Sequence, residues 1–157
     1  FISRKVIIGI IKILKGHQKC LYLGNLKSKR DWGHAKEFVD AQWKILQYKS
    51  PDDFVIATGK NYSVKDLVNL VLKKLKIKYL WKKDKKGYEY AIAQNDIGQI
   101  KKSQIIIKQE KIYFRPNEVH NLVGDYRKAT KLLKWKPKIK FDRLISEMID
   151  SDLKNII

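Results

Sequence analysis

Several residue types and patterns are scarce in this chain of 157 residues. Its single cysteine, Cys20, excludes an internal disulfide and fits a reducing compartment, so we expect a cytoplasmic protein. No run of about 18 apolar residues occurs, and the sequence therefore predicts no membrane span. The eight glycines form neither a GxGxxG turn nor a P-loop, and the cysteine and three histidines show no metal-ligand spacing. We therefore expect no metal site and no cofactor-binding loop in these residues.

Acidic residues are also few. The chain has 35 lysines and arginines against 16 aspartates and glutamates, which gives a formal net charge of +19. Such a charge makes nucleic-acid binding an alternative to consider. However, only five of the basic residues are arginines, and the lysines are spread over nearly every segment. Because phosphate clamping and base reading favour the planar arginine fork, this distribution indicates a solvated surface rather than a nucleic-acid interface.

Apolar side chains recur with helical and strand periods along the chain. Helical spacing predicts helices over residues 2–15, 35–47, 63–75, 125–133 and 141–153. Short apolar runs predict strands over residues 20–23, 54–57, 77–81 and 105–107. Residues 82–104 form a variable excursion, which we interpret as either a hairpin or a loop. Strands that alternate with helices indicate the α/β fold class.

A few side chains have predicted structural roles. Ser63 followed by Asp66 has the spacing of a capping box at a helix start. His34 precedes the second predicted helix, and we expect it to cap or pack there. Trp43 lies on an apolar helical stripe, so we expect it in the core, and Trp135 is expected to close the end of its helix against the core.

The loop over residues 23–36 has an unusual mixture of side chains. It carries Arg30, Asp31, Trp32 and His34 between an apolar strand and an amphipathic helix. A chain does not need this mixture to fold, and an arginine beside a helix start suits a phosphate. The alternative is that Arg30 only forms an ion pair with Asp31 or a neighbouring helix.

A second candidate site is the segment Arg115-Pro116-Asn117-Glu118. Proline stiffens the chain directly after Arg115, and Glu118 can accept hydrogen bonds from a sugar diol. The alternative is an ordinary turn with exposed charges. On the first helix, Lys5 is either a ligand contact or surface charge. Two arginines fixed on separate segments, Arg30 and Arg115, would make a clamp for a diphosphate.

These motifs resemble those of the GDP-mannose 4,6-dehydratases, which are extended short-chain dehydrogenase/reductases. The resemblance covers nearly the whole chain in order, and it is most specific in the string RDWGHAK, residues 30–36. Further matching motifs are LGNL at 23–26, FVIATG at 54–59, YSV at 62–64, YFRP at 113–116, and the segment that ends in WKP at 135–137. The segment over residues 108–112 departs from the family pattern, so the resemblance does not predict the strand register there.

The resemblance implies an α/β fold that corresponds to the C-terminal, substrate-binding part of such an enzyme, with the N-terminal Rossmann half absent. We therefore expect residues 1–157 to form one nucleotide-sugar-binding portion of a longer protein. By the same resemblance, Arg30 and Arg115 would hold the diphosphate, Glu118 a ribose hydroxyl, and Lys5 and Asn25 the guanosine of GDP-mannose.

The resemblance also implies a reaction. The family oxidises C4 of the mannose with NADP, eliminates water across C5 and C6, and returns the hydride to C6. The NADP loop and the Thr, Glu and Tyr-x-x-x-Lys residues of that chemistry belong to the Rossmann half. We therefore expect no catalytic residue here, no activity of the chain alone, and a partner that is either the missing half or a second copy. A non-catalytic nucleotide-sugar-binding module is the alternative.

Overall fold

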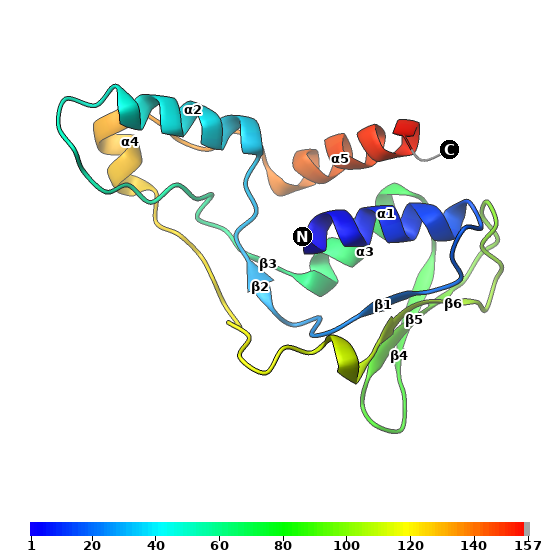
Figure 1. Cartoon of the computed structure of the whole chain (residues 1–157). Coiled ribbons are helices and arrows are strands. Elements are labelled where there is room, and N and C mark those ends of the chain that lie inside the picture. Colours follow the sequence, from blue (N-terminus) through cyan, green and yellow to red (C-terminus); the bar gives the residue numbers. More distant parts are fainter. Residues whose placement is uncertain (156–157) are drawn as a thin grey trace.

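The fold was obtained as a computed structural model that describes residues 1–155 (Figure 1). The helices are α1 (Ile2–Leu14), α2 (Ala35–Leu46), α3 (Val64–Lys74), the short 3-10 helix η1 (Lys111–Tyr113), α4 (Arg127–Leu133) and α5 (Phe141–Asn155). The strands are β1 (Leu21–Leu23), β2 (Lys29–Arg30), β3 (Tyr62–Ser63), β4 (Tyr79–Lys83), β5 (Glu89–Ala93) and β6 (Ile105–Gln109). The chain therefore has the predicted mixed α/β character.

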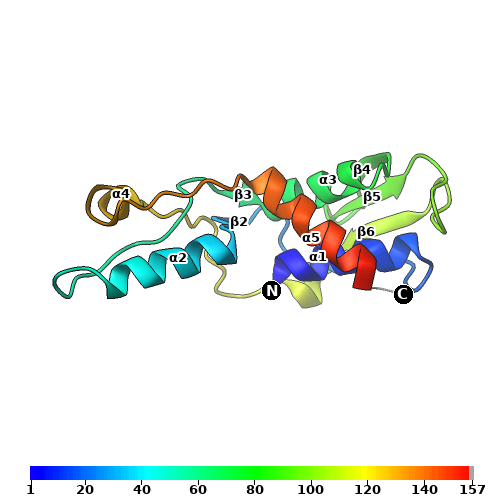
Figure 2. The same cartoon turned by 90° about the horizontal axis from the view of Figure 1, so that it is seen from above.

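The main sheet has four strands in the order β1-β6-β5-β4. β1 pairs with β6 in parallel, with Leu21 opposite Ile107, whereas the other two pairs are antiparallel. Helices α1 and α3 pack side by side on one face of this sheet, and α5 lies over them on the side away from the strands (Figures 1 and 2). One large apolar cluster fills the space between these layers, and it makes this part of the molecule the core region.

The helices of the core region follow directly from local sequence. On α1, Val6, Ile7 and Ile10 are buried as the helical period requires, and Gly16 ends the segment with a φ of +83°. The predicted capping box of α3 is confirmed, because Ser63 Oγ accepts from Asp66 N at 3.0 Å and Asp66 Oδ2 accepts from Ser63 N at 2.8 Å. These segments are set by their own residues.

A second region projects from the core region, and we call it the arm. It consists of α2, α4 and the segments over residues 47–59, 119–126 and 134–135, and both views show it extending beyond the sheet and its helices (Figures 1 and 2). Its own cluster has four buried residues, Ala41, Ala129, Leu133 and Trp135. Trp135 packs as predicted, and its indole donates to the carbonyl of Glu37 at 3.0 Å. The paired strands β2 and β3 lie where the arm meets the core region.

The prediction of a strand over Phe54–Ala57 is wrong. This segment is irregular in the arm, because no strand within residues 1–155 pairs with it. Phe54 and Ile56 pack instead against the arm cluster, whereas Val55 remains exposed. A strand needs a neighbour for its backbone groups, and local apolar sequence does not supply one.

The prediction that Trp43 lies in the core is also wrong. Trp43 is 61% exposed on α2, and Val39 and Leu46 are exposed beside it, whereas Ala41 is fully buried. Helix α4 covers one side of α2, and the other side faces outward. The apolar stripe on α2 therefore lacks a covering element among the described residues.

The remaining differences are small shifts in element boundaries. The strand predicted over 77–81 begins at Tyr79, because Lys76 adopts a φ of +58° after α3 and Ile77 turns into the core. Asp125 was expected to begin a helix that instead starts at Arg127, although its carboxylate still accepts from Arg127 N at 2.9 Å. Residues 82–104, which we interpreted as a hairpin or a loop, contain a hairpin between β4 and β5.

None of the described helices combines the length and the apolar character that crossing a membrane would need.

Candidate functional site

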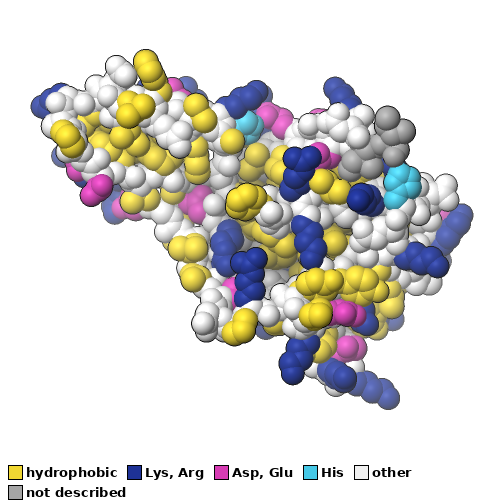
Figure 3. Space-filling model, in the orientation of Figure 1, with side chains coloured by type: hydrophobic (Ala, Val, Ile, Leu, Met, Phe, Trp, Pro, Cys, Tyr) yellow, Lys and Arg dark blue, Asp and Glu magenta, His cyan; other side chains and the backbone are white. Residues whose placement is uncertain are grey.

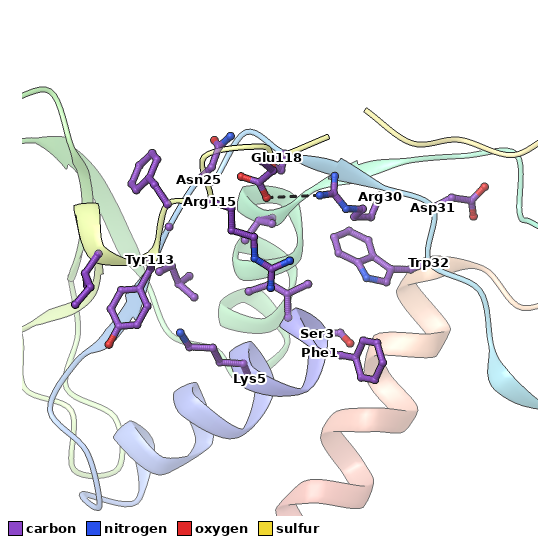
Figure 4. Close-up of a pocket in the computed structure, with 17 residues that line it drawn as sticks. Phe1, Ser3, Lys5, Asn25, Arg30, Asp31, Trp32, Tyr113, Arg115 and Glu118 are labelled. Atoms are coloured by element: carbon purple, nitrogen blue, oxygen red, sulfur yellow. Dashed lines mark ion pairs between the residues drawn. The ribbon is translucent and has the colours of Figure 1, made fainter. Parts of the chain in front are cut away.

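A cleft of about 760 Å³ opens between the N-terminal end of α1, the β1–β2 connection and the segment over residues 112–118 (Figure 4). The structure brings all five predicted ligand residues to this one cleft: Lys5, Asn25, Arg30, Arg115 and Glu118. Figure 3 shows basic side chains gathered around a hollow in the middle of one face, with hydrophobic side chains inside it. The combination suits a ligand that is partly anionic and partly apolar.

Backbone contacts at the end of the sheet bring the two predicted loops together. Strand β6 runs parallel to β1, and Glu110 N donates to Leu23 O at 2.9 Å where both strands end. The Gln109 side chain is buried and donates to Gly24 O at 2.9 Å. A Cβ on Gly24 would collide with the carbonyl oxygen of Tyr113, so the close approach requires glycine. Sequence reasoning missed the role of Gln109 in joining the two loops. The signal that could have indicated it is a side-chain amide at the end of an apolar strand.

Arg30 is held on the wall of the cleft by two backbone acceptors and one ion pair. Its Nη1 donates to Lys29 O at 2.7 Å and to Val119 O at 2.6 Å, and its Nη2 lies 3.5 Å from Glu118 Oε1. The side chains of Arg30 and Glu118 are 27% and 17% exposed. The guanidinium therefore has a defined position at the cleft, and it links two segments that lie almost 90 residues apart in the chain.

Asp31 does not pair with Arg30. Its carboxylate accepts from Thr58 N at 2.9 Å, from Thr58 Oγ1 at 2.5 Å and from Gly59 N at 2.9 Å, with Gly124 N at 3.4 Å. In Figure 4, Asp31 points away from the guanidinium of Arg30. The ion pair between these neighbours, considered as an alternative from sequence, is therefore not formed. Asp31 instead ties the arm to the start of the cleft.

Arg115 and Lys5 bring two more positive charges to the cleft. The side chain of Arg115 extends from the segment before Pro116 toward the space between Lys5 and Arg30 (Figure 4). Within residues 1–155 no ion pair is formed by Arg115. The Lys5 ammonium lies 4.3 Å from the centroid of the Tyr113 ring, a cation–π contact that holds it over the cleft. Sequence reasoning gave Tyr113 no role in the site.

Asn25 and Trp32 complete the lining. Asn25 lies at the rim opposite Lys5, and its side-chain oxygen accepts from Lys27 N at 2.9 Å, which leaves its amide N–H groups for a ligand. Trp32 stacks on Phe141 with ring centroids 5.4 Å apart, and Phe141 stacks in turn on Tyr62 at 4.2 Å. This stack gives the cleft a rigid aromatic side. His34 caps α2 as predicted, because its Nδ1 accepts from Lys36 N at 3.2 Å.

Apart from the cleft, the described residues form neither a dinucleotide-binding loop nor a metal site. The N-cap residues of helices α1 to α4 are Phe1, His34, Ser63 and Tyr126. Within residues 1–155 no glycine-rich loop leads into any helix. Over the same range no group of three His, Cys, Asp or Glu side chains could hold a metal ion. The residues present therefore do not fit NADP.

One pair in the chain has the Tyr-x-x-x-Lys spacing, Tyr79 and Lys83. Both lie on strand β4, where residues four apart are separated by about 13 Å, whereas a helix brings them within about 6 Å. Burial raises the pKa of Tyr79, and its ring packs edge-on against Trp81 at 6.3 Å. A tyrosine that acts as a general acid or base near neutral pH needs a lowered pKa, whereas the pKa of Tyr79 is raised. Together with the strand geometry, this indicates that the pair has a structural role.

Comparisons with known proteins agree on the family. The family described as GDP-mannose 4,6 dehydratase matches residues 1–148. The chain is 40% identical over 157 residues to the GDP-mannose 4,6-dehydratase of Vibrio cholerae, with 98% of this chain and 42% of that protein covered. It is 38% identical over 155 residues to the GDP-mannose 4,6 dehydratase of Homo sapiens, of which it covers 40%. The chain thus spans about two fifths of the length of these curated relatives.

Solved structures show the same fold at low sequence identity. RMD from Pseudomonas aeruginosa, complexed with NADPH, has a TM-score of 0.72 and 15% identity, with 99% of this chain and 43% of that chain covered. The dTDP-glucose 4,6-dehydratase from Bacillus anthracis, in complex with NAD, has a TM-score of 0.67 and 17% identity, with 96% and 39% covered. The fold is therefore that of part of an extended short-chain dehydrogenase/reductase. With the family match over residues 1–148, the chain belongs to the GDP-mannose 4,6-dehydratase family.

Proposed function

We propose that this chain binds the GDP moiety of GDP-mannose and forms the substrate-binding part of an NADP-dependent GDP-mannose 4,6-dehydratase. The observation that carries the proposal is the convergence of Arg30, Arg115 and Lys5, with Glu118, in one cleft of a chain of this family. Surface lysines scattered over the rest of the chain do not explain this convergence. Nothing in the cleft favours a nucleic acid, because its basic groups surround a hollow and do not form a strip along the surface.

The diphosphate would lie between Arg30 and Arg115. Each guanidinium can present two parallel N–H donors to phosphate oxygens, which gives both affinity and a fixed orientation. Glu118 would accept hydrogen bonds from ribose hydroxyls, since a carboxylate is the natural partner of a diol. Lys5 and Asn25 would contact the guanosine from opposite rims of the cleft, because their donors match the acceptors on a guanine edge.

The contribution of this chain to the reaction would be binding and orientation. Contacts to the non-reacting GDP moiety hold the hexose in place, and that binding energy can be used for orientation at the reacting carbons. In the complete enzyme NADP would supply the redox chemistry, held by residues outside this chain. The cofactor contacts and the acid–base residues would come from the part of its longer relatives that this chain does not cover.

The exposed apolar stripe on α2 supports the proposal that another element covers this helix in the complete enzyme. Val39, Trp43 and Leu46 form an exposed apolar row, and Val55 on the neighbouring irregular segment is exposed as well. Such a patch on a single chain indicates a surface that another element covers. We propose that the covering element is the Rossmann half of the complete enzyme, which would also give residues 54–57 a strand to pair with. Self-association through this patch is the competing outcome.

Titration calorimetry with GDP tests the binding proposal. We expect Arg30→Met and Arg115→Met each to weaken binding by about tenfold or more, since each removes charge-assisted hydrogen bonds. Arg127→Met is the matched control, because Arg127 pairs with Asp125 on the arm and does not line the cleft. Equal losses in all three variants, or no GDP binding by the unsubstituted chain, would contradict the proposal. Turnover of GDP-mannose by the chain with NADP alone would contradict the assignment of the chemistry elsewhere.

A further inference from the structure

The four-stranded main sheet has one covered face and one open face. The α-helices of the core region all lie on one side of it, so the other side is uncovered within residues 1–155 (Figures 1 and 2). Burial along β1 agrees with this arrangement, because Leu21 and Leu23 are buried whereas Tyr22 between them is 40% exposed. On the outer strands, Leu80 and Ile105 are exposed as well. We call this uncovered surface the open face of the sheet.

Strand pairing places aromatic and basic side chains in one row across the open face. From β1 across β6 and β5 to β4, the row consists of Tyr22, Lys108, Tyr90 and Lys82. Residues that lie opposite each other on paired strands share a face of the sheet, so all four belong to the face of Tyr22. The two tyrosines are two strand spacings apart, about 10 Å, with one lysine between them and another beyond Tyr90. Aromatic and cationic side chains therefore alternate along the row.

The hairpin between β4 and β5 adds positive charge beside this row. Figure 3 shows basic side chains at the lower end of the molecule, where Figure 1 places the hairpin. Its exposed lysines are Lys82, Lys83, Lys85 and Lys86. Two carboxylates offset part of the charge, since Glu110 Oε1 lies 3.3 Å from Lys108 Nζ and Asp84 accepts from backbone N–H groups within the turn. Five lysines against two carboxylates leave the open face and its hairpin positive, which suits an anionic partner.

The alternating row indicates which anionic partner fits. Rings on an open sheet stack on unpaired bases, and cations beside the rings neutralise the phosphates that link those bases. A duplex keeps its base faces inside the stack, and an acidic protein would leave the row of rings without a role. We propose that the open face binds single-stranded nucleic acid, with bases stacked on Tyr22 and Tyr90 and phosphates beside Lys108 and Lys82. None of these four residues lines the cleft.

The proposal gives some of the lysines a role that the sequence did not indicate. Base reading favours arginine, and on that ground the spread of lysines along the chain was interpreted as a solvated surface. Stacking combined with neutralisation of the phosphate backbone requires no base reading, so lysine is sufficient for it. Because the four residues come from four separate strands, only the pairing of the sheet brings them into one row.

Fluorescence anisotropy with a labelled oligothymidylate of about 12 nucleotides at low salt tests the proposal. We expect Tyr22→Leu and Tyr90→Leu each to weaken binding by about tenfold, because each removes a stacking ring and leaves the charge unchanged. Lys82→Gln should reduce the slope of log affinity against log salt concentration by about 0.7, the value for one phosphate contact on a single strand. Lys131→Gln is the matched control and should leave the slope unchanged, because Lys131 is exposed on α4 in the arm.

A second comparison needs no substitution, so it decides the question even where a variant fails to fold. We expect the unsubstituted chain to bind an abasic deoxyribose-phosphate oligomer of the same length about tenfold or more weakly than oligothymidylate, since the charge is kept and the bases are lost. Excess GDP should leave oligothymidylate bound, because the cleft lies elsewhere. Equal affinity for the two oligomers would overturn the proposal, because the face would then be a basic surface for any polyanion. Displacement by GDP, or no binding of oligothymidylate at low salt, would also overturn it, and both results leave the proposed function standing.

Discussion

The core region and the arm bury their apolar side chains to very different extents. In the core region, α1, α3 and α5 stack on a four-stranded sheet, and a continuous cluster fills the layers between them. In the arm, α2 meets α4 over four buried residues, while the opposite face of α2 is exposed. Both regions have amphipathic helices. The sequence pattern therefore determines which face of a helix is apolar, whereas the presence of a covering element determines whether that face is buried.

The cleft lies next to the boundary between these two regions. Arg30 lies on β2, the strand that pairs with β3 where the arm joins, and Asp31 directly after it binds the arm through Thr58 and Gly59. Arg115 and Glu118 lie on the segment that leads from the sheet back to the arm. The site therefore uses the rigid core region for position, and the connection to the arm determines how Arg30 is presented.

The largest effect on the free energy of unfolding should come from a cavity in the core region. Ile7 is fully buried on α1, and Ile7→Ala should lower the free energy of unfolding by about 2–5 kcal/mol through lost burial and the cavity left behind. Leu46→Ala on the exposed face of α2 should change it by less than about 0.5 kcal/mol. Urea denaturation followed by circular dichroism measures both. Similar losses in the two variants would remove the distinction between the regions.

A smaller loss of stability is expected when the hydrogen bonds between Asp31 and the arm are weakened. Asp31→Asn replaces a carboxylate that accepts from two backbone N–H groups and a hydroxyl, and we expect a loss of about 1–3 kcal/mol. Amide hydrogen exchange should accelerate at Thr58 and Gly59 and remain unchanged in α1, because the opening is local to the arm. Asp53→Asn, at an exposed position of the irregular segment before Phe54, provides the control. Uniform acceleration across the whole chain would mean that the arm is not a separate unit.

The smallest effect concerns the thiol of Cys20, at the start of β1. Burial raises the pKa of Cys20 from 9.0 to about 11, so the thiolate fraction at pH 8 should be about a hundredfold below that of an unperturbed thiol. The sign follows from the cost of burying the charged form, and reactivity should rise steeply only as the pH approaches 11. Reaction with an aromatic disulfide reagent, compared in native and urea-unfolded chain, measures this. Equal rates in both states would show that β1 is open at this edge.

Sequence reasoning succeeds where neighbouring residues decide the structure. The helices over residues 2–14 and 64–74 were predicted because their apolar spacing and the Ser63–Asp66 capping box are local signals. His34 at the start of α2 was predicted for the same reason. The prediction failed for Phe54–Ala57 and Trp43, because each depends on an element that would pair with or cover it.

The candidate site was only partly accessible to sequence reasoning. The residue types of Arg30, Arg115 and Glu118 indicated a diphosphate clamp, and the family resemblance linked them. Their meeting in space depends on the parallel pairing of β1 with β6 and on the Gln109 bridge to Gly24, which lie far apart in the chain. The partner of Glu118 was not foreseen, because no local signal says that Arg30 turns away from Asp31 and toward a residue almost 90 positions later.

The affinity ratio between guanosine and GDP tests the central claim most directly. If Arg30 and Arg115 clamp the diphosphate, the unsubstituted chain should bind GDP about a hundredfold more tightly than guanosine, and the double variant Arg30→Met/Arg115→Met should bind the two ligands with nearly equal affinity. Calorimetric titration of both ligands into both proteins gives the four constants needed. A ratio that remains near a hundredfold in the double variant would contradict the clamp, because the diphosphate would then be held elsewhere.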